Sequence, residues 1–135
     1  MNKLKEALIK ACNAMAEKAV SMNMKGVAVA TVLPKGSEVD WMGEMKVVGS
    51  PVNVDGHGWN LVAIAWSKAG EVIASGANSG DPNRQVLMGE LNFVGGAYDE
   101  ADGYKFAFAF SGGLSEDDLL VAQYGIEILK SLILQ

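Results

Sequence analysis

The stretch YKFAFAFS, at residues 104–111, alternates large and small side chains with a period of two. Successive side chains of a β-strand point to opposite faces of a sheet, so this alternation predicts a strand with two unlike faces. The bulky face carries Tyr104, Phe106, Phe108 and Phe110, and the other face carries Lys105, Ala107, Ala109 and Ser111. The small face allows another element to pack very closely against the sheet.

Apolar periodicity along the rest of the chain predicts three helices and two hairpins. The first helix is expected to end at Lys25-Gly26, because a cation and a glycine both suit a helix C-terminus. The predicted elements are a helix at 3–24, strands at 26–33 and 38–48 about a turn at 34–37, a loop at 81–96 with a short turn of helix, strands at 97–99 and 104–111, and a helix at 115–132. An antiparallel sheet covered by helices, an α+β fold, accommodates this order.

The segment WNLVAIAWSKAGEVIASG, within 59–76, fits two structures. As a helix it places an apolar stripe at helical spacing and is ended by Gly76 or Asn78. As a hairpin it forms two strands about residues 67–70. Propensity does not decide between them, because Gly70 disfavours a helix by about 1 kcal/mol relative to alanine.

Composition narrows the classes of partner. The 135 residues fit one domain, 1–135, with a formal net charge of −5 and a pI near 4.8. Since the basic residues are scattered singly, neither nucleic acid nor an anionic membrane surface is expected as a partner. Cys12 is the only cysteine, which excludes an internal disulfide and a Cys-rich zinc site. With no signal-peptide block or membrane-length apolar run in the sequence, a cytoplasmic location is expected.

The motif SGGLSEDD follows the alternating strand and starts the last helix. Gly112-Gly113 between a strand and a helix is a place where a phosphate could bind. The three carboxylates of the first helical turn would repel a phosphate but suit the positive end of the helix dipole. We therefore predict that Ser115 is the N-cap and that Asp118 completes a capping box, with a metal or acid–base role for the carboxylates as the alternative.

Three blocks of the sequence resemble the GlcG/HbpS-like family, also called the haem-degrading domain family, to which the C-terminal domain of PduO-type proteins is related. The blocks are MAEKAVSMNMKGVAVATVLPKGS, IAWSKAGEVIASGANSG and GGAYDEADGYKFAFAFSGGLSEDDLLVAQYGIEIL. The second block resembles a helix of the family that has an IA-x-x-KA pattern, which favours a helix at 59–76. The third block resembles the family's short strand, turn, strand, Ser-Gly-Gly and helix, with Ser111, Gly112, Gly113, Asp118 and Ala122 at its characteristic positions.

The resemblance implies a profilin-like fold with α-β-α layers. It also implies assembly into homo-oligomers, and it makes haem a candidate ligand because some members of the family bind haem. We expect a ligand to lie between the sheet and the 59–76 helix, near Lys68 and the Gly112-Gly113 turn.

The candidate ligand-binding residues are Lys68, His57, Trp59, Gly112, Gly113 and Tyr98. His57, the only histidine, is the candidate axial ligand of a haem, with Trp59 beside the ring. Lys68 is a candidate to meet an anionic group, and Tyr98 a candidate to line the same cleft or a subunit interface. No metal ligands and no catalytic residues are predicted.

Each candidate has a structural alternative. His57 can be a solvent-exposed loop residue, and Lys68 can extend along the helix edge with its amine in water. Cys12 could bind haem as a thiolate, but its place beside the apolar helix stripe favours a small buried side chain.

The leading functional hypothesis is a small-molecule-binding domain that forms a homo-oligomer, with little or no catalysis. No nucleophile and base can be paired, because the single histidine cannot be placed against a serine or cysteine. The alternatives are an assembly or interaction protein with a vestigial pocket, and a weak enzyme acting on a haem-like ring or a small organic acid.

Overall fold

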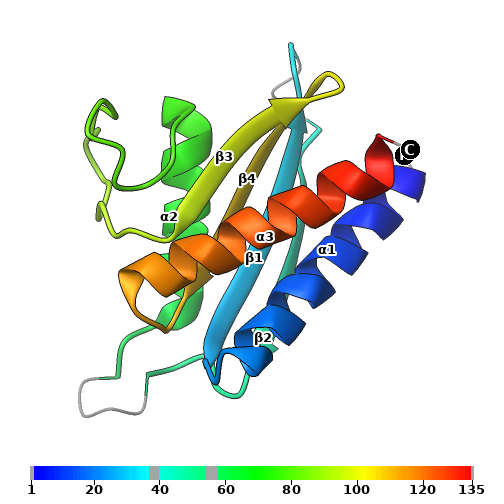
Figure 1. The fold of residues 1–135 in the computed structure, drawn as a ribbon. Helices are drawn as coiled ribbons and strands as arrows, with labels where there is room; N and C mark the ends of the chain where they lie inside the picture. Colours follow the sequence, from blue (N-terminus) through cyan, green and yellow to red (C-terminus); the bar gives the residue numbers. More distant parts are fainter. Residues whose placement is uncertain (1, 37–39, 54–57, 135) are drawn as a thin grey trace.

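The computed structural model describes residues 2–36, 40–53 and 58–134. Its elements are α1 (Asn2–Ser21), β1 (Gly26–Pro34), β2 (Met42–Val48), α2 (Leu61–Ser75), β3 (Gly96–Ala101), β4 (Tyr104–Ser111) and α3 (Ser115–Ile133). The four strands form one antiparallel sheet in the order β2-β1-β4-β3. Figure 1 shows α1 and α3 side by side on one face and α2 on the other, so the predicted α+β fold with α-β-α layers is confirmed.

The two faces of β4 build two separate cores. Phe106, Phe108 and Phe110 are fully buried in the core beneath α1 and α3. Ala107 and Ala109 are fully buried in a smaller core beneath α2. Because alanine projects little from the sheet, α2 packs close to β4, as the alternation predicts.

The helical interpretation of residues 59–76 is confirmed by α2. Its N-cap is Asn60, whose side-chain oxygen accepts a hydrogen bond from the Ala63 amide at 3.0 Å. Its C-cap is Gly76, which has a left-handed φ of 68° and donates its amide to the Val72 carbonyl. Both caps are local to the sequence, whereas the choice between helix and hairpin depends on the sheet that α2 covers.

The end of α1 differs from the prediction. The helix ends at Ser21, and the left-handed residue after it is Asn23, with φ 58°. Met24 then donates its amide to the Ala19 carbonyl at 2.8 Å, which closes the helix end. Gly26 instead begins β1, where a Cβ would lie 2.0 Å from the Ser111 carbonyl oxygen. The glycine therefore serves the close approach of two strands rather than the helix cap.

The strands and the long loop also refine the prediction. Within the described residues β2 begins at Met42, and residue 37 of the predicted turn and residues 38–39 of the predicted strand lie outside them. β3 is longer than predicted, because its turn falls at Asp102-Gly103, two residues with positive φ. The predicted turn of helix at 81–96 is wrong: residues 77–95 contain turns but no helix.

The start of α3 corrects the capping prediction. The N-cap is Leu114, which has no side-chain hydrogen bond to the helix, and Ser115 is already the first helical residue. Gly125, inside α3, allows a close contact between helices, because a Cβ there would lie 2.5 Å from Met15 Cγ. Gly125 is therefore a packing glycine and does not break the helix.

Candidate functional site

Lys68 and Asp118 form a buried ion pair where α2 meets the start of α3. Each residue is only 3% exposed. Lys68 Nζ donates to Asp118 Oδ2 at 3.1 Å and to the Phe110 carbonyl oxygen at 2.9 Å. The alternative in which Lys68 reaches water along the helix edge is therefore wrong. The anionic group that it meets is a carboxylate of its own chain.

The Gly112-Gly113 turn presents its backbone to the same carboxylate. Gly113 donates its amide to Asp118 Oδ1 at 2.9 Å. Gly112 has a φ of 138°, and a Cβ there would lie 2.2 Å from the Lys25 carbonyl oxygen, so the turn needs glycine. Asp118 thus occupies the amide that a phosphate would use. The carboxylate that was expected to cap the helix instead joins α2, the turn and α3.

Burial shifts the titration of both partners toward their neutral forms. It lowers the pKa of the Lys68 ammonium and raises the pKa of the Asp118 carboxyl. The attraction between the two charges and their hydrogen bond oppose both shifts. The pair is therefore held together by its mutual attraction in a place where each charge alone is unfavourable.

A cavity of about 230 Å³ opens beside this pair. Its walls come from four segments: the residues before α2, α2 itself, the end of the long loop, and the turn into α3. The lining residues are Asn53, Trp59, Leu61, Ile64, Lys68, Phe93, Val94, Ser111, Gly112, Gly113, Ser115 and Asp118. Trp59 and Phe93 meet edge to face at one wall, with ring centroids 6.0 Å apart.

The cavity brings together four of the six predicted residues, namely Lys68, Trp59, Gly112 and Gly113. It lies between the sheet and α2, where the sequence places a ligand. His57 lies outside the described residues. The sequence reasoning missed Phe93 and Val94, because nothing in the loop that carries them predicts that it returns to α2.

Tyr98 lies on β3, away from this cavity. Its hydroxyl donates to Glu100 Oε2 at 2.8 Å, and it lines a separate hollow with Asn78, Asp99 and Gln123. Partial burial and the Glu100 carboxylate raise the pKa of the Tyr98 phenol, so it stays protonated. Tyr98 and Lys68 line different hollows, so of the two predicted roles of Tyr98 the shared cleft is not found, and the subunit interface stays a prediction.

Cys12 is unsuited to the thiolate role that the sequence left open. It is 2% exposed within the core beneath α1. Burial, followed by the charge of Glu44, raises the pKa of the Cys12 thiol to about 12. A neutral thiol in an apolar core is the small buried side chain that its sequence position favours.

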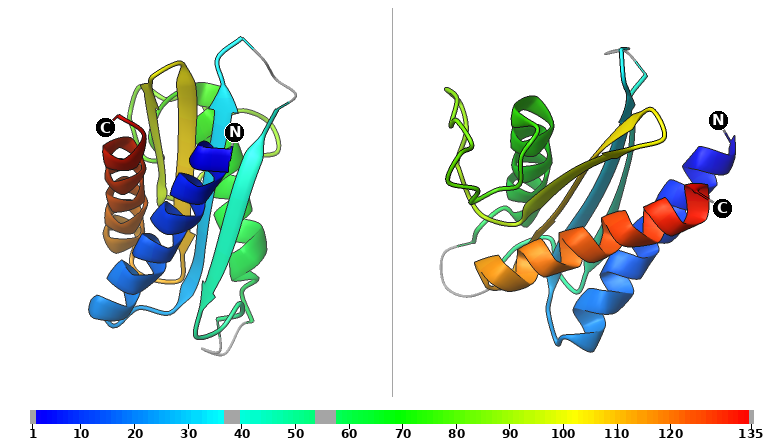
Figure 2. Two further views of the ribbon diagram at one scale, coloured as in Figure 1. Left: turned by 90° about the vertical axis from the view of Figure 1, so that its right-hand side faces the viewer. Right: turned by 45° about the horizontal axis from the view of Figure 1, so that its top comes forward.

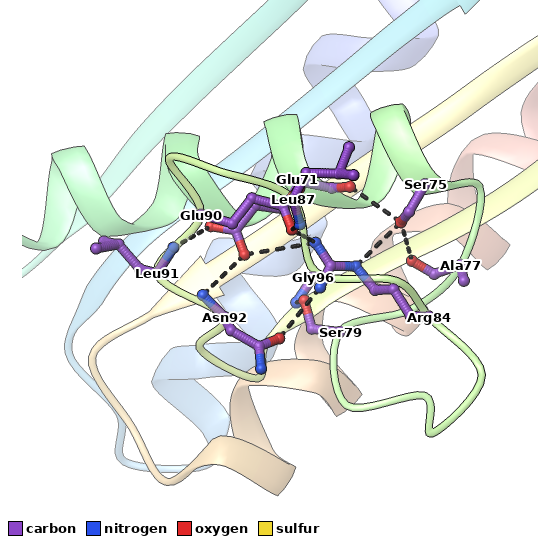
Figure 3. Close-up of polar contacts among 10 residues, drawn as sticks. All are labelled: Glu71, Ser75, Ala77, Ser79, Arg84, Leu87, Glu90, Leu91, Asn92 and Gly96. Carbon is purple, nitrogen blue, oxygen red and sulfur yellow. Dashed lines mark hydrogen bonds and ion pairs between the residues drawn. The ribbon is translucent and has the colours of Figure 1, made fainter.

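A second buried polar cluster fixes the loop that forms the cavity wall. Arg84 is 8% exposed, and its side chain donates to Ser75 Oγ at 3.0 Å, Asn92 Oδ1 at 3.1 Å and Glu90 Oε1 at 2.7 Å. Figure 3 shows these contacts converging under α2. Glu71 of α2 accepts the amides of Leu91 and Asn92 at 3.2 Å and 3.0 Å. The residue after them is Phe93, so the cluster sets where the cavity wall stands.

Two further features bear on the site. Among the described residues no three His, Cys, Asp or Glu side chains gather in a way that could hold a metal ion. Within the same residues no helix has the length and apolar character needed to cross a membrane.

These features describe an α+β domain with a small, partly polar cavity at one end of α2, the helix that by itself covers one face of the sheet. Comparison of the sequence with protein-family models and with curated proteins yields no match. Comparison of the fold with solved structures does.

The crystal structure of Klebsiella pneumoniae protein ORFY, of the family model DUF336, matches with a TM-score of 0.67 at 20% identity, over 94% of this chain and 90% of that one. The crystal structure of HbpS matches with a TM-score of 0.61 at 22% identity, over 93% and 88%. The crystal structure of a PduOC:heme complex matches with a TM-score of 0.59 at 19% identity, over 91% of both chains. The chain shares the fold of these proteins, so the fold that the sequence resemblance implies is confirmed.

Proposed function

We propose that the chain is a binding domain for a small organic molecule that occupies the cavity beside Lys68. The observation that carries the proposal is the state of the Lys68 amine. An ammonium group has three N–H donors, and the two acceptors found for it are Asp118 Oδ2 and the Phe110 carbonyl. Among the described residues no third acceptor is present, and Lys68 lines the cavity. A ligand oxygen would complete its hydrogen bonding.

Charge and wall chemistry limit the ligand. Asp118 balances the charge of Lys68, so the polar end of the cavity suits a neutral carbonyl or a single carboxylate better than a polyanion such as a phosphate ester. The remaining walls combine an apolar part, with Leu61, Ile64 and Phe93, and the polar side chains of Asn53, Ser111 and Ser115. We therefore propose a ligand with an apolar body and one oxygen acceptor group.

Benzoate is a suitable probe of this class. We expect it to perturb the fluorescence of the tryptophans saturably, because Trp59 lines the cavity. Lys68→Met should weaken the binding by on the order of tenfold or more. Lys105→Met on β4 is the matched control, since Lys105 does not line the cavity and should leave binding unchanged.

A cavity-filling variant separates binding from stability. Ile64→Trp narrows the cavity without touching the Lys68–Asp118 pair, so it should abolish benzoate binding in a folded protein. Circular dichroism verifies the fold of each variant. Binding that survives both Lys68→Met and Ile64→Trp would place the ligand elsewhere and overturn the proposal.

Haem is a second candidate, favoured by the fold that the chain shares with the PduOC:heme complex. The described cavity does not fit haem well. Its volume lies below the range of about 300–1,000 Å³ found for drug-sized ligands. Among the lining residues that the structure describes, none is a His, Cys, Met or Tyr, the side chains that bind haem iron in proteins. An axial histidine would have to be His57, two residues before Trp59 in the sequence.

A hemin titration tests the second candidate. A saturable change in the Soret band that is lost in His57→Ala and kept in Lys68→Met would favour haem over the smaller ligand. A titration that is linear in hemin, with no saturation, would remove haem from consideration.

We further propose that the chain assembles with copies of itself. The support is a group of large apolar side chains that stay exposed on β2 and α2, chiefly Met45, Val47 and Trp66. Each is at least 40% exposed, and such residues clustered on one surface are typical of contact surfaces. Sedimentation analysis at micromolar concentration tests this, and a strict monomer would contradict it.

A further inference from the structure

The two edges of the sheet are treated differently. At the β3 edge, Gly96 donates its amide to Ser79 Oγ at 3.1 Å, and Tyr98 donates its amide to Asn78 Oδ1 at 2.8 Å. The loop after α2 therefore covers that edge. At the other edge, the only strand that pairs with β2 among the described residues is β1. Figure 2 shows β2 along the outer border of the sheet. Bare edges of this kind can pair with another chain.

The face of β2 that points toward the α2 side is apolar and open. Met45 is 42% exposed, Val47 40% and Trp66 of α2 40%. Trp66 reaches across to β2, where its indole nitrogen donates to Met45 Sδ at 3.4 Å. A Cβ on Gly43 would lie 3.1 Å from this ring, so the glycine lets the indole lie over the strand. An apolar strip therefore runs along the free edge.

The opposite face of β2 carries opposite charges two residues apart, at Glu44 and Lys46. Lys46 is exposed, and its amine donates to Asn13 Oδ1 of α1 at 3.0 Å. Glu44 is half-buried on the same side of the strand. Met45 lies between the two charged residues. A second copy of the strand, rotated by 180° about an axis beside Met45, therefore places its Lys46 opposite Glu44 and its Glu44 opposite Lys46.

We propose that β2 pairs antiparallel with β2 of a second copy about a two-fold axis that passes beside Met45. This inference rests on the proposed self-association and names its surface. In this register Glu44 of each copy lies opposite Lys46 of the other, which forms two equivalent charge pairs. Opposite charges placed directly across an antiparallel pair stabilise it. Both sheets then join into one sheet of eight strands.

The register is selected by the sequence of the strand. Centring the axis on Glu44 or on Lys46 would set like charges opposite each other, which destabilises the pairing. Centring it on Gly43 or Val47 would leave part of the seven-residue strand without a partner. Only the axis at Met45 uses all of β2, from Met42 to Val48, and pairs both charges.

Apolar contacts on both faces agree with the same register. On the α2 face, Met45 meets its own copy, and Val47 lies opposite Gly43, where it meets the exposed Trp66 ring of the other chain. On the α1 face, Met42 lies opposite Val48. Val48 borders a hollow of about 540 Å³ between α1 and β2, which is also lined by Val20. Met42 packs against the core of its own chain, and in this register its exposed part would face this hollow of the other copy.

Charge reversal tests the pairing. We expect Glu44→Lys and Lys46→Glu each to weaken the dimer by on the order of tenfold or more, since each replaces two attractive pairs with two repulsive ones. The double variant Glu44→Lys/Lys46→Glu should dimerise again. An equal mixture of the two single variants should form a heterodimer, because β2 then carries two positive charges in the first variant and two negative charges in the second. Sedimentation velocity measures all four states, and circular dichroism confirms that each variant is folded.

Cross-linking gives an independent test. Residues directly opposite in an antiparallel pair have Cα atoms about 4.5–5.5 Å apart, within the range of about 4.4–6.8 Å that a disulfide needs. Met45→Cys should therefore form a disulfide-linked dimer under mild oxidation. Val47→Cys is the matched control: its two copies are four residues out of step, about 13 Å apart at about 3.3 Å per residue, and should not link. The native Cys12 is buried and does not interfere.

The outcomes separate two failures. A wild-type protein that is monomeric at tens of micromolar overturns both the β2 pairing and the proposed self-association. An assembly that resists the charge reversals and does not link through Met45→Cys leaves self-association standing but overturns the β2 pairing. Single variants that weaken the dimer but do not combine into a heterodimer overturn the register.

Discussion

Helix α2 carries two buried charges, and the protein treats them in opposite ways. Glu71 and its partner Arg84 form a closed cluster in which each Arg84 nitrogen has an acceptor of the chain itself. Lys68, about one helical turn earlier, has two acceptors and stands beside a cavity. Burial of a charge therefore does not by itself mark a ligand site. The difference lies in the surroundings: each Arg84 nitrogen meets an acceptor of the chain inside a packed cluster, whereas Lys68 also lines a cavity.

The Arg84 cluster also supports the site around Lys68. Glu71 accepts the amides of Leu91 and Asn92, immediately before the two loop residues that line the cavity, Phe93 and Val94. The loop at 77–95 has no helix or strand of its own, so these polar contacts hold its course. The structural cluster and the candidate site are thus two ends of one arrangement around α2.

The largest expected effect comes from breaking the closed cluster. Arg84→Ala leaves the Glu71 and Glu90 carboxylates buried without their cation. Removing one partner of a buried ion pair costs about 3–5 kcal/mol, and we expect a loss of this size in the free energy of unfolding. Chemical denaturation followed by circular dichroism measures it.

An exposed pair supplies the control. Lys35 bonds Glu100 at 2.6 Å with both side chains more than 40% exposed, so Lys35→Ala should leave the free energy of unfolding nearly unchanged. If Arg84→Ala cost as little stability as Lys35→Ala, the Arg84 cluster would not hold the loop. The cluster could then not be called structural in contrast to the Lys68–Asp118 pair.

Removing the lysine of the Lys68–Asp118 pair should cost less stability than removing Arg84. A second substitution should restore part of that loss. Lys68→Met leaves Asp118 without its cation, but the carboxylate keeps the Gly113 amide. We expect a loss of about 2–3 kcal/mol. Adding Asp118→Asn removes the uncompensated charge while keeping an oxygen for Gly113, so the double variant should recover at least about 1 kcal/mol of that loss.

This rescue distinguishes the Lys68–Asp118 pair from the Arg84 cluster. At Arg84, two carboxylates and an asparagine depend on one guanidinium, so no single neutralisation restores the Arg84→Ala variant. Unfolding curves for Arg84→Ala/Glu71→Gln give the comparison. A full rescue there, or none at Lys68, would reverse the assignment of the closed and the open cluster.

The sequence predicts features that depend on local pattern. The Phe and Ala alternation of β4 gives both cores, and the position of Lys68 within α2 follows once α2 is taken as a helix. The features that sequence reasoning missed depend on distant contacts. Nothing near Arg84 or Phe93 in the sequence shows that the loop returns to α2, and nothing near Asp118 shows that its carboxylate turns to Lys68 instead of capping its own helix.

Strand β2 shows a further limit. A strand has a side-chain period of two, so Met45 and Val47 share a face, and both are exposed on it. Periodicity assigns residues to a face, but it does not say whether another element covers that face. In this fold α2 lies over β1, β3 and β4 and reaches toward β2 through Trp66, which leaves the apolar strip open.

Cys12 is a third buried group, and its thiol carries no charge at neutral pH. Its thiol lies in the core beneath α1, and its one polar contact is a weak one to the Ala28 carbonyl at 3.9 Å. Burial raises the pKa of this thiol from its ordinary 9.0 to about 12. Unlike Lys68 and Glu71, Cys12 forms no ion pair within the described part of the chain, and burial and Glu44 outweigh the charge of Lys46, which favours the thiolate.

The last effect follows from this shift; it is absent at neutral pH and appears only in alkali. Because the pKa in the folded protein exceeds that of the unfolded chain, the contribution of Cys12 is complete below pH 9 and is lost as the pH rises toward 12. The stability of the wild type relative to Cys12→Ala should fall by at most about 1.4 kcal/mol per pH unit in that window. Urea unfolding of both proteins at several pH values measures this difference, and lysine and tyrosine titration cancels between them. A difference that does not change with pH would show that the thiolate is tolerated in the core, and Cys12 would again become a possible thiolate ligand for haem.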